Sequence, residues 1–200
     1  MKKISSSFSM SAIFIIAMFT SPPCSAARKL LSSETDTAFI KTWCDSTSYP
    51  DLCFATFSSY AAEIKGSPQI LATKSLFVAL NTTRSASKSF NKLRKKQGLK
   101  TREAAALQDC VEEISDSFDE IKRSVAEMGE SGGKSFAFRM SDVQTWASAA
   151  LTDENTCMDG FSETAVDGAV KDKVRTVIEK VAHLTSISLS IVNRYAGAKN

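Results

Sequence analysis

The sequence predicts an all-α protein, an up-down-up-down four-helix bundle with an N-terminal disulfide-stapled helical hairpin. Between Thr101 and Met128, apolar residues recur at alternating steps of four and three without Pro or Gly, which is the period of a helix with one buried face. Long amphipathic segments of this kind occur four times, and no stretch alternates with a period of two for long enough to form a sheet. Short connectors favour antiparallel packing of neighbouring helices.

Residues 1–27 have the features of a secretory signal peptide. Two lysines are followed by an apolar run at 12–19 that is too short to span a bilayer, and small residues precede Arg28. We expect cleavage after Ala26 or Ala27, export, and no membrane contact of the mature domain, 28–200. Loss of both lysines takes the formal charge from +3 to +1, which excludes the basic footprint of a nucleic-acid-binding protein.

The hairpin is predicted over 34–62, as short helices at 34–43 and 50–62 on either side of a turn. Neither helix is long enough to persist alone in water. The mature chain has four cysteines, an even number that is typical of two disulfides in an exported protein. Spacing alone permits three pairings, but a local bridge between Cys44 and Cys53 is geometrically easy and leaves Cys110 with Cys157.

The bundle is predicted over 67–196. Its first helix runs from Pro68 to about Lys96, with Ser67 as the cap. Its expected inward face carries Ile70, Phe77, Leu80, Thr83, Ser87 and Phe90. The second helix, 101–128, turns inward Leu107, Val111, Ile114, Phe118, Ile121, Val125 and Met128.

A flexible connector at 129–139 separates the two halves of the predicted bundle. Ser141 then begins a capping box with Gln144, which starts a helix to about Phe161. Its inward residues are Val143, Ala147, Ala150, Cys157 and Phe161. The last helix covers 167–195, with inward Val170, Val174, Val177, Val181, Leu184, Ile191 and Tyr195.

The inventory of reactive groups indicates a protein that binds rather than catalyses. His183 is the single histidine, so nucleophilic catalysis has no base and a metal site has too few ligands once the cysteines form bridges; we expect neither cofactor nor metal. An acidic band follows the second bundle helix, and nothing in the sequence indicates a selectively raised pKa within it. Asn81 begins a glycosylation sequon with Thr82 and Thr83.

Four segments carry a resemblance to a known family: WCDSTSYPDLC, ALQDCVEE, DVQTWASAALTDENTCMDGF and LTSISLSIVNRYA. Across almost all of its mature length, the chain resembles the plant invertase and pectin methylesterase inhibitor family. The resemblance implies the same bundle and the same disulfide pairing. It also implies a secreted protein of the apoplast or cell wall that covers the substrate cleft of a cell-wall enzyme in a one-to-one complex.

By this resemblance, the partner-binding residues are Glu112, Asp116, Asp119 and Thr156. Gly132 to Phe136 lacks the Pro-Lys-Phe element of the invertase-directed branch, which argues against invertase as the target. The segment from Val143 to Phe161 instead resembles pectin methylesterase inhibitors. Inhibition of cell-wall or vacuolar invertase is the alternative, and a non-inhibitory secreted helical binding module is a second one. A homodimer through the hairpin is also possible.

Overall fold

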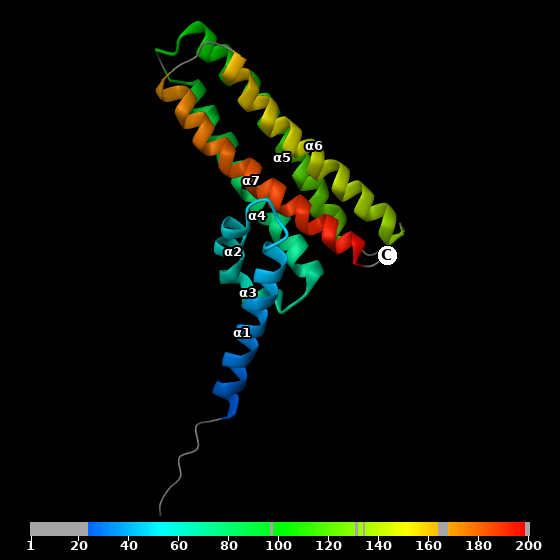
Figure 1. Ribbon diagram of the computed structural model, residues 1–200. Coiled ribbons are helices and arrows are strands. Elements are labelled where there is room, and N and C mark those ends of the chain that lie inside the picture. The colour runs from blue at the N-terminus through cyan, green and yellow to red at the C-terminus, as the bar shows by residue number, and fades with distance from the viewer. Residues whose placement is uncertain (1–23, 97, 131, 134, 164–167, 199–200) are drawn as a thin grey trace, which may run out of the picture.

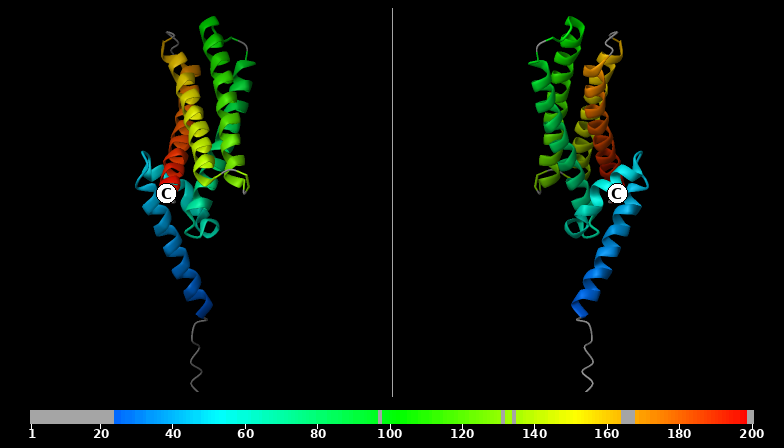
Figure 2. Two further views of the ribbon diagram at one scale, coloured as in Figure 1. Left: turned by 90° about the vertical axis from the view of Figure 1, so that its right-hand side faces the viewer. Right: turned by 90° about the vertical axis from the view of Figure 1, so that its left-hand side faces the viewer.

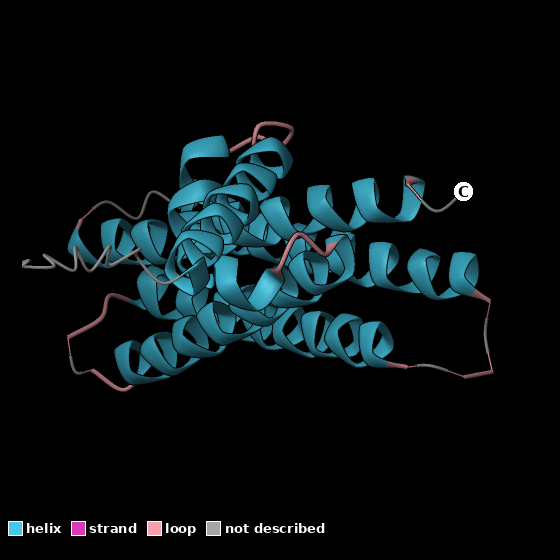
Figure 3. Cartoon of the chain, turned by 90° about the horizontal axis from the view of Figure 1, so that it is seen from below, coloured by secondary structure: helices cyan, strands magenta, loops and turns pink. Residues whose placement is uncertain are grey.

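A computed structural model describes residues 24–96, 98–130, 132–133, 135–163 and 168–198. Within these ranges all regular structure is helical, which confirms the all-α prediction (Figure 3). No helix among these residues has the length and apolar composition needed to cross a bilayer. The elements are α1 (Cys24–Cys44), α2 (Pro50–Phe57), the 3-10 helix η1 (Ser58–Tyr60), α3 (Ala61–Ile64), α4 (Pro68–Arg94), α5 (Thr101–Gly129), α6 (Phe136–Glu163) and α7 (Ala169–Gly197).

Helices α4 to α7 form a four-helix bundle in which α4 contacts α5 and α7, and α6 contacts the same two helices (Figures 1 and 2). Side-chain pairs give the direction of each neighbour, because the residue number rises along one helix as it falls along the next. The pairs are Arg84–Phe118 and Arg94–Gln108 for α4 and α5, Cys110–Cys157 and Ser117–Glu154 for α5 and α6, and Gln144–Asn193 and Glu154–Thr185 for α6 and α7. Consecutive helices are therefore antiparallel, as the up-down-up-down prediction requires.

The predicted inward faces of α5, α6 and α7 form most of the core. All five predicted residues of α6 are buried, as are five of the seven on α5; Phe118 and Val125 are partly buried and pack against the core. On α7, Val170 and Val177 are also partly buried, and the other predicted residues are buried. A period of 3.6 residues was sufficient to find these faces.

The predicted face of α4 is partly wrong. Leu80, Thr83 and Phe90 are buried, but Ile70 and Phe77 are 41% and 49% exposed. The core instead receives a second apolar stripe of the same helix, with Leu71, Ala72, Leu76, Ala79, Ala86 and Leu93. Two apolar faces overlap on this helix. The face that packs against the hairpin, α5 and α7 is the buried one. Ser67 caps the helix as predicted, since its Oγ accepts a hydrogen bond from the Ile70 N–H at 3.3 Å.

The predicted start of α6 at Ser141 is also wrong. The helix begins at Phe136, five residues earlier, and the Ser135 Oγ accepts a hydrogen bond from the Phe138 N–H at 3.2 Å. Ser141 therefore lies inside the helix, where no free N–H needs a cap. The Gln144 side chain contacts the neighbouring helix instead, donating from Nε2 to Asn193 Oδ1 at 2.9 Å.

The N-terminal hairpin contains a longer first helix than predicted. Helix α1 begins at Cys24 because Pro23 is the last Pro or Gly before Trp43. The Cys44–Cys53 disulfide joins it to α2, with a Cα–Cα distance of 5.4 Å, and α3 completes the second arm of the hairpin. Most of the predicted signal peptide, 1–23, lies outside the described residues, so its cleavage stays a prediction.

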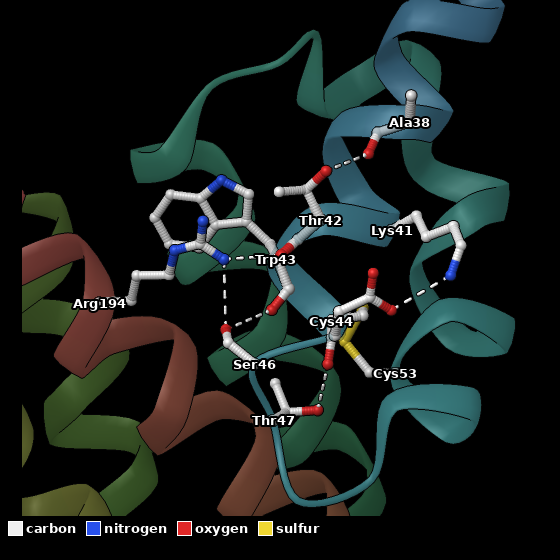
Figure 4. Close-up of polar contacts among 10 residues, drawn as sticks. Ala38, Lys41, Thr42, Trp43, Cys44, Ser46, Thr47, Cys53 and Arg194 are labelled. Carbon is white, nitrogen blue, oxygen red and sulfur yellow. Dashed lines mark hydrogen bonds and ion pairs between the residues drawn. A yellow bond between two sulfur atoms is a disulfide. The ribbon is translucent and has the colours of Figure 1, made fainter.

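The hairpin packs on one end of its own bundle, close to the C-terminal end of α7, and the N-terminal part of α1 extends away from it (Figure 2). Ile40, Trp43 and Phe57 belong to the same buried cluster as Leu184 and Ile191 of α7. At its edge, Arg194 Nη1 donates to the Thr42 carbonyl at 2.7 Å and to Ser46 Oγ at 3.2 Å. The guanidinium lies 4.3 Å from the centre of the Trp43 ring (Figure 4).

Candidate functional site on α5 and α6

The acidic strip consists of Glu112, Asp116 and Asp119, which are exposed on α5. Steps of four and three residues put these side chains on one face of the helix. Thr156 is exposed on α6, and its hydroxyl donates to the Thr152 carbonyl at 3.0 Å. All four residues that the resemblance implicates are therefore accessible to a partner.

A disulfide ties the two helices together where these residues begin. Cys110 and Cys157 are bonded with a Cα–Cα distance of 4.3 Å, which confirms the predicted pairing. Thr156 directly precedes one cysteine and Glu112 follows the other by two residues. The bond therefore holds Thr156 and Glu112 at a similar level of the bundle, although they are 44 residues apart in the chain.

Glu112 is held in place by a chain of hydrogen bonds that sequence analysis missed. Gln108 Nε2 donates to Glu112 Oε1 at 2.6 Å, and Arg94 of α4 donates to Gln108 Oε1 from the other side. The spacing of Gln108 and Glu112 by four residues could have indicated the first bond. The second needed the position of another helix. Together they order a carboxylate that would otherwise sample several rotamers.

Next to the strip, the carboxyls of Glu120 on α5 and Asp153 on α6 form a pair. Partial burial, and then Asp153 itself, raise the pKa of Glu120 from 4.5 to about 7, and Arg123 opposes the shift. Glu120 can therefore keep its proton near neutrality and donate it to Asp153, whose own pKa is also raised, chiefly by burial. Partial burial and Asp153 raise the pKa of Glu113 as well. The expectation that no carboxyl here is selectively perturbed was wrong, because α6 brings a second carboxyl to α5.

Behind this pair, Glu154 lies in the centre of the bundle and is fully buried. Its Oε1 accepts hydrogen bonds from Ser117 Oγ of α5 and Thr185 Oγ1 of α7, both at 2.8 Å, so one carboxyl connects three helices. Its Oε2 is buried without a partner. Burial raises the pKa of Glu154 to about 8, despite the opposing effect of the two hydroxyls. A neutral acid suits this site, since an ionised one would be a buried charge that is repelled by Asp153 and Glu120.

Glu154 could have been found in the sequence by its position. It stands four residues after Ala150 and three before Cys157, on the predicted inward face of α6. The sequence did not show that hydroxyls from two other helices lie beside Glu154 and make a buried carboxyl tolerable there.

The remaining groups do not assemble a reactive centre in the described part of the chain. His183 stacks on Tyr49 of the hairpin turn, with ring centres 3.8 Å apart and planes inclined by 28°. Among the described residues no group of three or more His, Cys, Asp or Glu could hold a metal ion. The surface that stands out is the acidic strip with Thr156, on a pair of helices joined by a disulfide.

Comparison with known proteins identifies the family. A family model described as plant invertase/pectin methylesterase inhibitor matches residues 38–191. The chain belongs to this family. The matched range contains the hairpin from Ala38 onward, both disulfides, the acidic strip and Thr156, so the site described above lies within the family domain.

Named relatives in the plant invertase/pectin methylesterase inhibitor family are similar over most of this chain. A protein named "21 kDa protein" from Daucus carota is 47% identical over 79% of this chain and 83% of its own length. Pectinesterase inhibitor 10 of Arabidopsis thaliana is 43% identical over 84% of this chain and 54% of its own length. A crystal structure of a mutant pectin methylesterase inhibitor from Arabidopsis has a TM-score of 0.63 at 19% identity, over 77% of this chain and 95% of that one, and supports the fold.

Proposed function

We propose that this protein inhibits pectin methylesterase by placing the α5–α6 side of its bundle over the substrate cleft of the enzyme. The exposed acidic strip carries the proposal. A cleft that accommodates polyanionic pectin is expected to offer positive or hydrogen-bond-donating groups, and carboxylates in a row are complementary to these groups. Membership of an inhibitor family, and a relative named as a pectinesterase inhibitor, favour the same function.

The site is suited to a binding role because it is already ordered. The Cys110–Cys157 bond joins α5 to α6, and Gln108 holds Glu112. Ordering of side chains and loops opposes association, so a preorganised surface loses less free energy on binding. Blocking a cleft in this way requires no catalytic group on the inhibitor. We therefore expect a stable complex in which the enzyme is blocked and the inhibitor is unchanged.

A triple variant tests the surface: Glu112→Gln, Asp116→Asn and Thr156→Ala. We expect the inhibition constant toward pectin methylesterase to rise at least about tenfold, equivalent to about 1.4 kcal/mol of binding free energy. The thermal midpoint should change little, because all three side chains are exposed. An unaltered inhibition constant would remove this face from the proposal.

The chain offers a matched control on α7. Asp172, Thr176 and Glu179 are exposed, and the Thr176 hydroxyl donates to the Asp172 carbonyl just as Thr156 does to Thr152. The corresponding triple variant, Asp172→Asn, Thr176→Ala and Glu179→Gln, removes the same charges from another helix. It should inhibit as the wild type does, which separates a local contact from a general effect of net charge.

The choice of target enzyme is tested by assaying the same preparation against pectin methylesterase and against cell-wall and vacuolar invertases. Inhibition of an invertase without inhibition of pectin methylesterase would overturn the proposal in favour of the other branch of the family. Inhibition of neither would favour a non-inhibitory binding module.

Stoichiometry and location complete the proposal. The hairpin packs on its own bundle, so we infer one inhibitor chain per enzyme molecule, and sedimentation of the free inhibitor would detect a homodimer by its doubled mass. We further infer export through the signal peptide at 1–27. N-terminal sequencing of protein from the culture medium should begin at Ala27 or Arg28, and retention of the intact leader inside the cell would contradict export.

A further inference from the structure

The outer face of α4 carries an exposed apolar groove. Ile70 and Phe77, 41% and 49% exposed, are two of the three large hydrophobic residues exposed in the described part of the chain; the third is Phe138. Seven residues correspond to two helical turns, so both side chains lie on the same line. The groove has a volume of about 390 Å³ and is lined by Gln69, Ile70, Thr73, Lys74 and Phe77. Three polar side chains thus border an apolar floor.

Asn81 stands on the same face, one turn after Phe77. It is exposed, whereas Ala79, Leu80 and Thr83 point into the bundle. Side chains on a helix lean toward its N-terminus, so a group attached to Asn81 lies over the preceding turn, where Phe77 is. The rise over four residues is about 6 Å, which is within reach of the first sugars of a glycan.

We propose that Asn81 carries an N-linked glycan whose first sugars pack into the groove of Ile70 and Phe77. N-Acetylglucosamine has one apolar face of C–H bonds and an acetyl methyl group, which suit a phenylalanine ring and an isoleucine. Its hydroxyl groups can pair with the Gln69 side chain and can donate to the Thr73 hydroxyl oxygen, whose own proton goes to the Gln69 carbonyl, while Lys74 is ion-paired with Glu63. Covering this groove removes exposed apolar surface that would otherwise favour association. The inference depends on the proposed export and not on the proposed inhibition.

Attachment has to precede folding of α4. In the folded chain Thr83 is fully buried and its hydroxyl donates to the Ala79 carbonyl at 3.0 Å, so the sequon is closed to an enzyme. On the unfolded chain, Asn81 Nδ2 attacks C1 of the first sugar of a lipid-diphosphate-linked oligosaccharide. The bond from C1 to the phosphate oxygen breaks, the lipid diphosphate leaves, and Nδ2 loses one proton.

The experiment compares the full chain secreted from a eukaryotic host with the same chain from a bacterial periplasm, which forms disulfides but lacks this glycan. Mass spectrometry of the secreted protein should show a glycan that is absent in the Asn81→Gln variant. The thermal midpoint of the secreted protein should exceed that of the bacterial protein by about 2 °C or more, the shift expected for contacts of about 1 kcal/mol in a domain of this size.

Phe77→Ser is the decisive variant, because it removes the ring and keeps the sequon. The difference in thermal midpoint between the two hosts should disappear in Phe77→Ser and persist in Phe138→Ser, which alters an exposed phenylalanine of α6. An unmodified Asn81 would overturn the proposal. So would an equal difference between hosts in wild type and Phe77→Ser, or a secreted protein that dimerises through Phe77, since a second copy would then occupy the groove. Inhibition of pectin methylesterase, measured on the same samples, reports separately on the proposed function.

Discussion

Replacement of Glu154 by Gln gives the sharpest test of the bundle interior. Burial favours the neutral acid and raises its pKa from 4.5 to about 8 in the folded state. Between these two values the folded protein binds more protons than the unfolded chain, so the free energy of unfolding falls as the pH rises. The slope is about 1.4 kcal/mol per pH unit, which amounts to about 3 kcal/mol between pH 4.5 and pH 7 and about 5 kcal/mol above pH 8.

Gln matches the protonated form of Glu154. Its Oε1 can accept from Ser117 and Thr185 as the acid does, and its Nε2 is a donor at the position of the acid's O–H. Glu154→Gln should therefore resemble the wild type near pH 5 and exceed it in unfolding free energy by about 3 kcal/mol near pH 7.5. This difference corresponds to a rise in thermal midpoint of roughly 6 to 12 °C.

The assay is urea unfolding followed by circular dichroism at half-unit steps from pH 5 to pH 8.5. Glu179→Gln, an exposed change of the same type on α7, serves as the control and should follow the wild-type curve. Other carboxyls affect wild type and variant alike, so the difference between the two curves isolates Glu154. Parallel curves for wild type and Glu154→Gln would refute the argument, as would a variant that loses stability relative to the wild type between pH 5 and pH 8.

Three further predictions concern the site and the hairpin. Inhibition should be stronger at pH 5.5 than at pH 7.5, because near pH 7 Glu120 loses the proton that it shares with Asp153, and repulsion between the two carboxylates then disturbs the surface where α5 and α6 meet. Glu120→Gln should flatten this dependence, and inhibition that strengthens from pH 5 to pH 8 would contradict it. Gln108→Ala should raise the inhibition constant about threefold, through loss of the bond that orders Glu112, with little change in thermal midpoint; calorimetry should show the loss in binding entropy. Arg194→Ala should lower the free energy of unfolding by about 1 kcal/mol and redshift Trp43 fluorescence, whereas an unchanged spectrum would mean that the hairpin is held without this contact.

The hydrophobic period and the cysteine count, both local properties, were enough to predict most of this fold. The inward residues of α5, α6 and α7 could be read from single helices, because a stripe of apolar residues leaves only one face to bury. Cys44 and Cys53 are close enough in sequence to pair locally, and their pairing left one partner for Cys110. The four candidate contact residues came from resemblance, and the structure leaves all four exposed, three on α5 and one on α6.

The failures share a physical cause. On α4, two apolar stripes overlap, and the helices that pack around it decided that Leu71 and Leu76 are inside while Ile70 and Phe77 are outside. The SDVQ segment has the pattern of a cap, but Ser141 lies inside a helix that began at Phe136. Each outcome depends on neighbours that are distant in sequence, which a local pattern does not contain.

By itself, the sequence determined that this chain is a set of amphipathic helices braced by two disulfides, since helix period and cysteine pairing are expressed along the chain. Only the tertiary structure decided which carboxyls keep their protons. The pKa values of Glu120 and Glu154 depend on Asp153, Ser117 and Thr185 and on the exclusion of water between helices. Electrostatic free energy is set by distance and burial in space, and these arise when α5, α6 and α7 pack together.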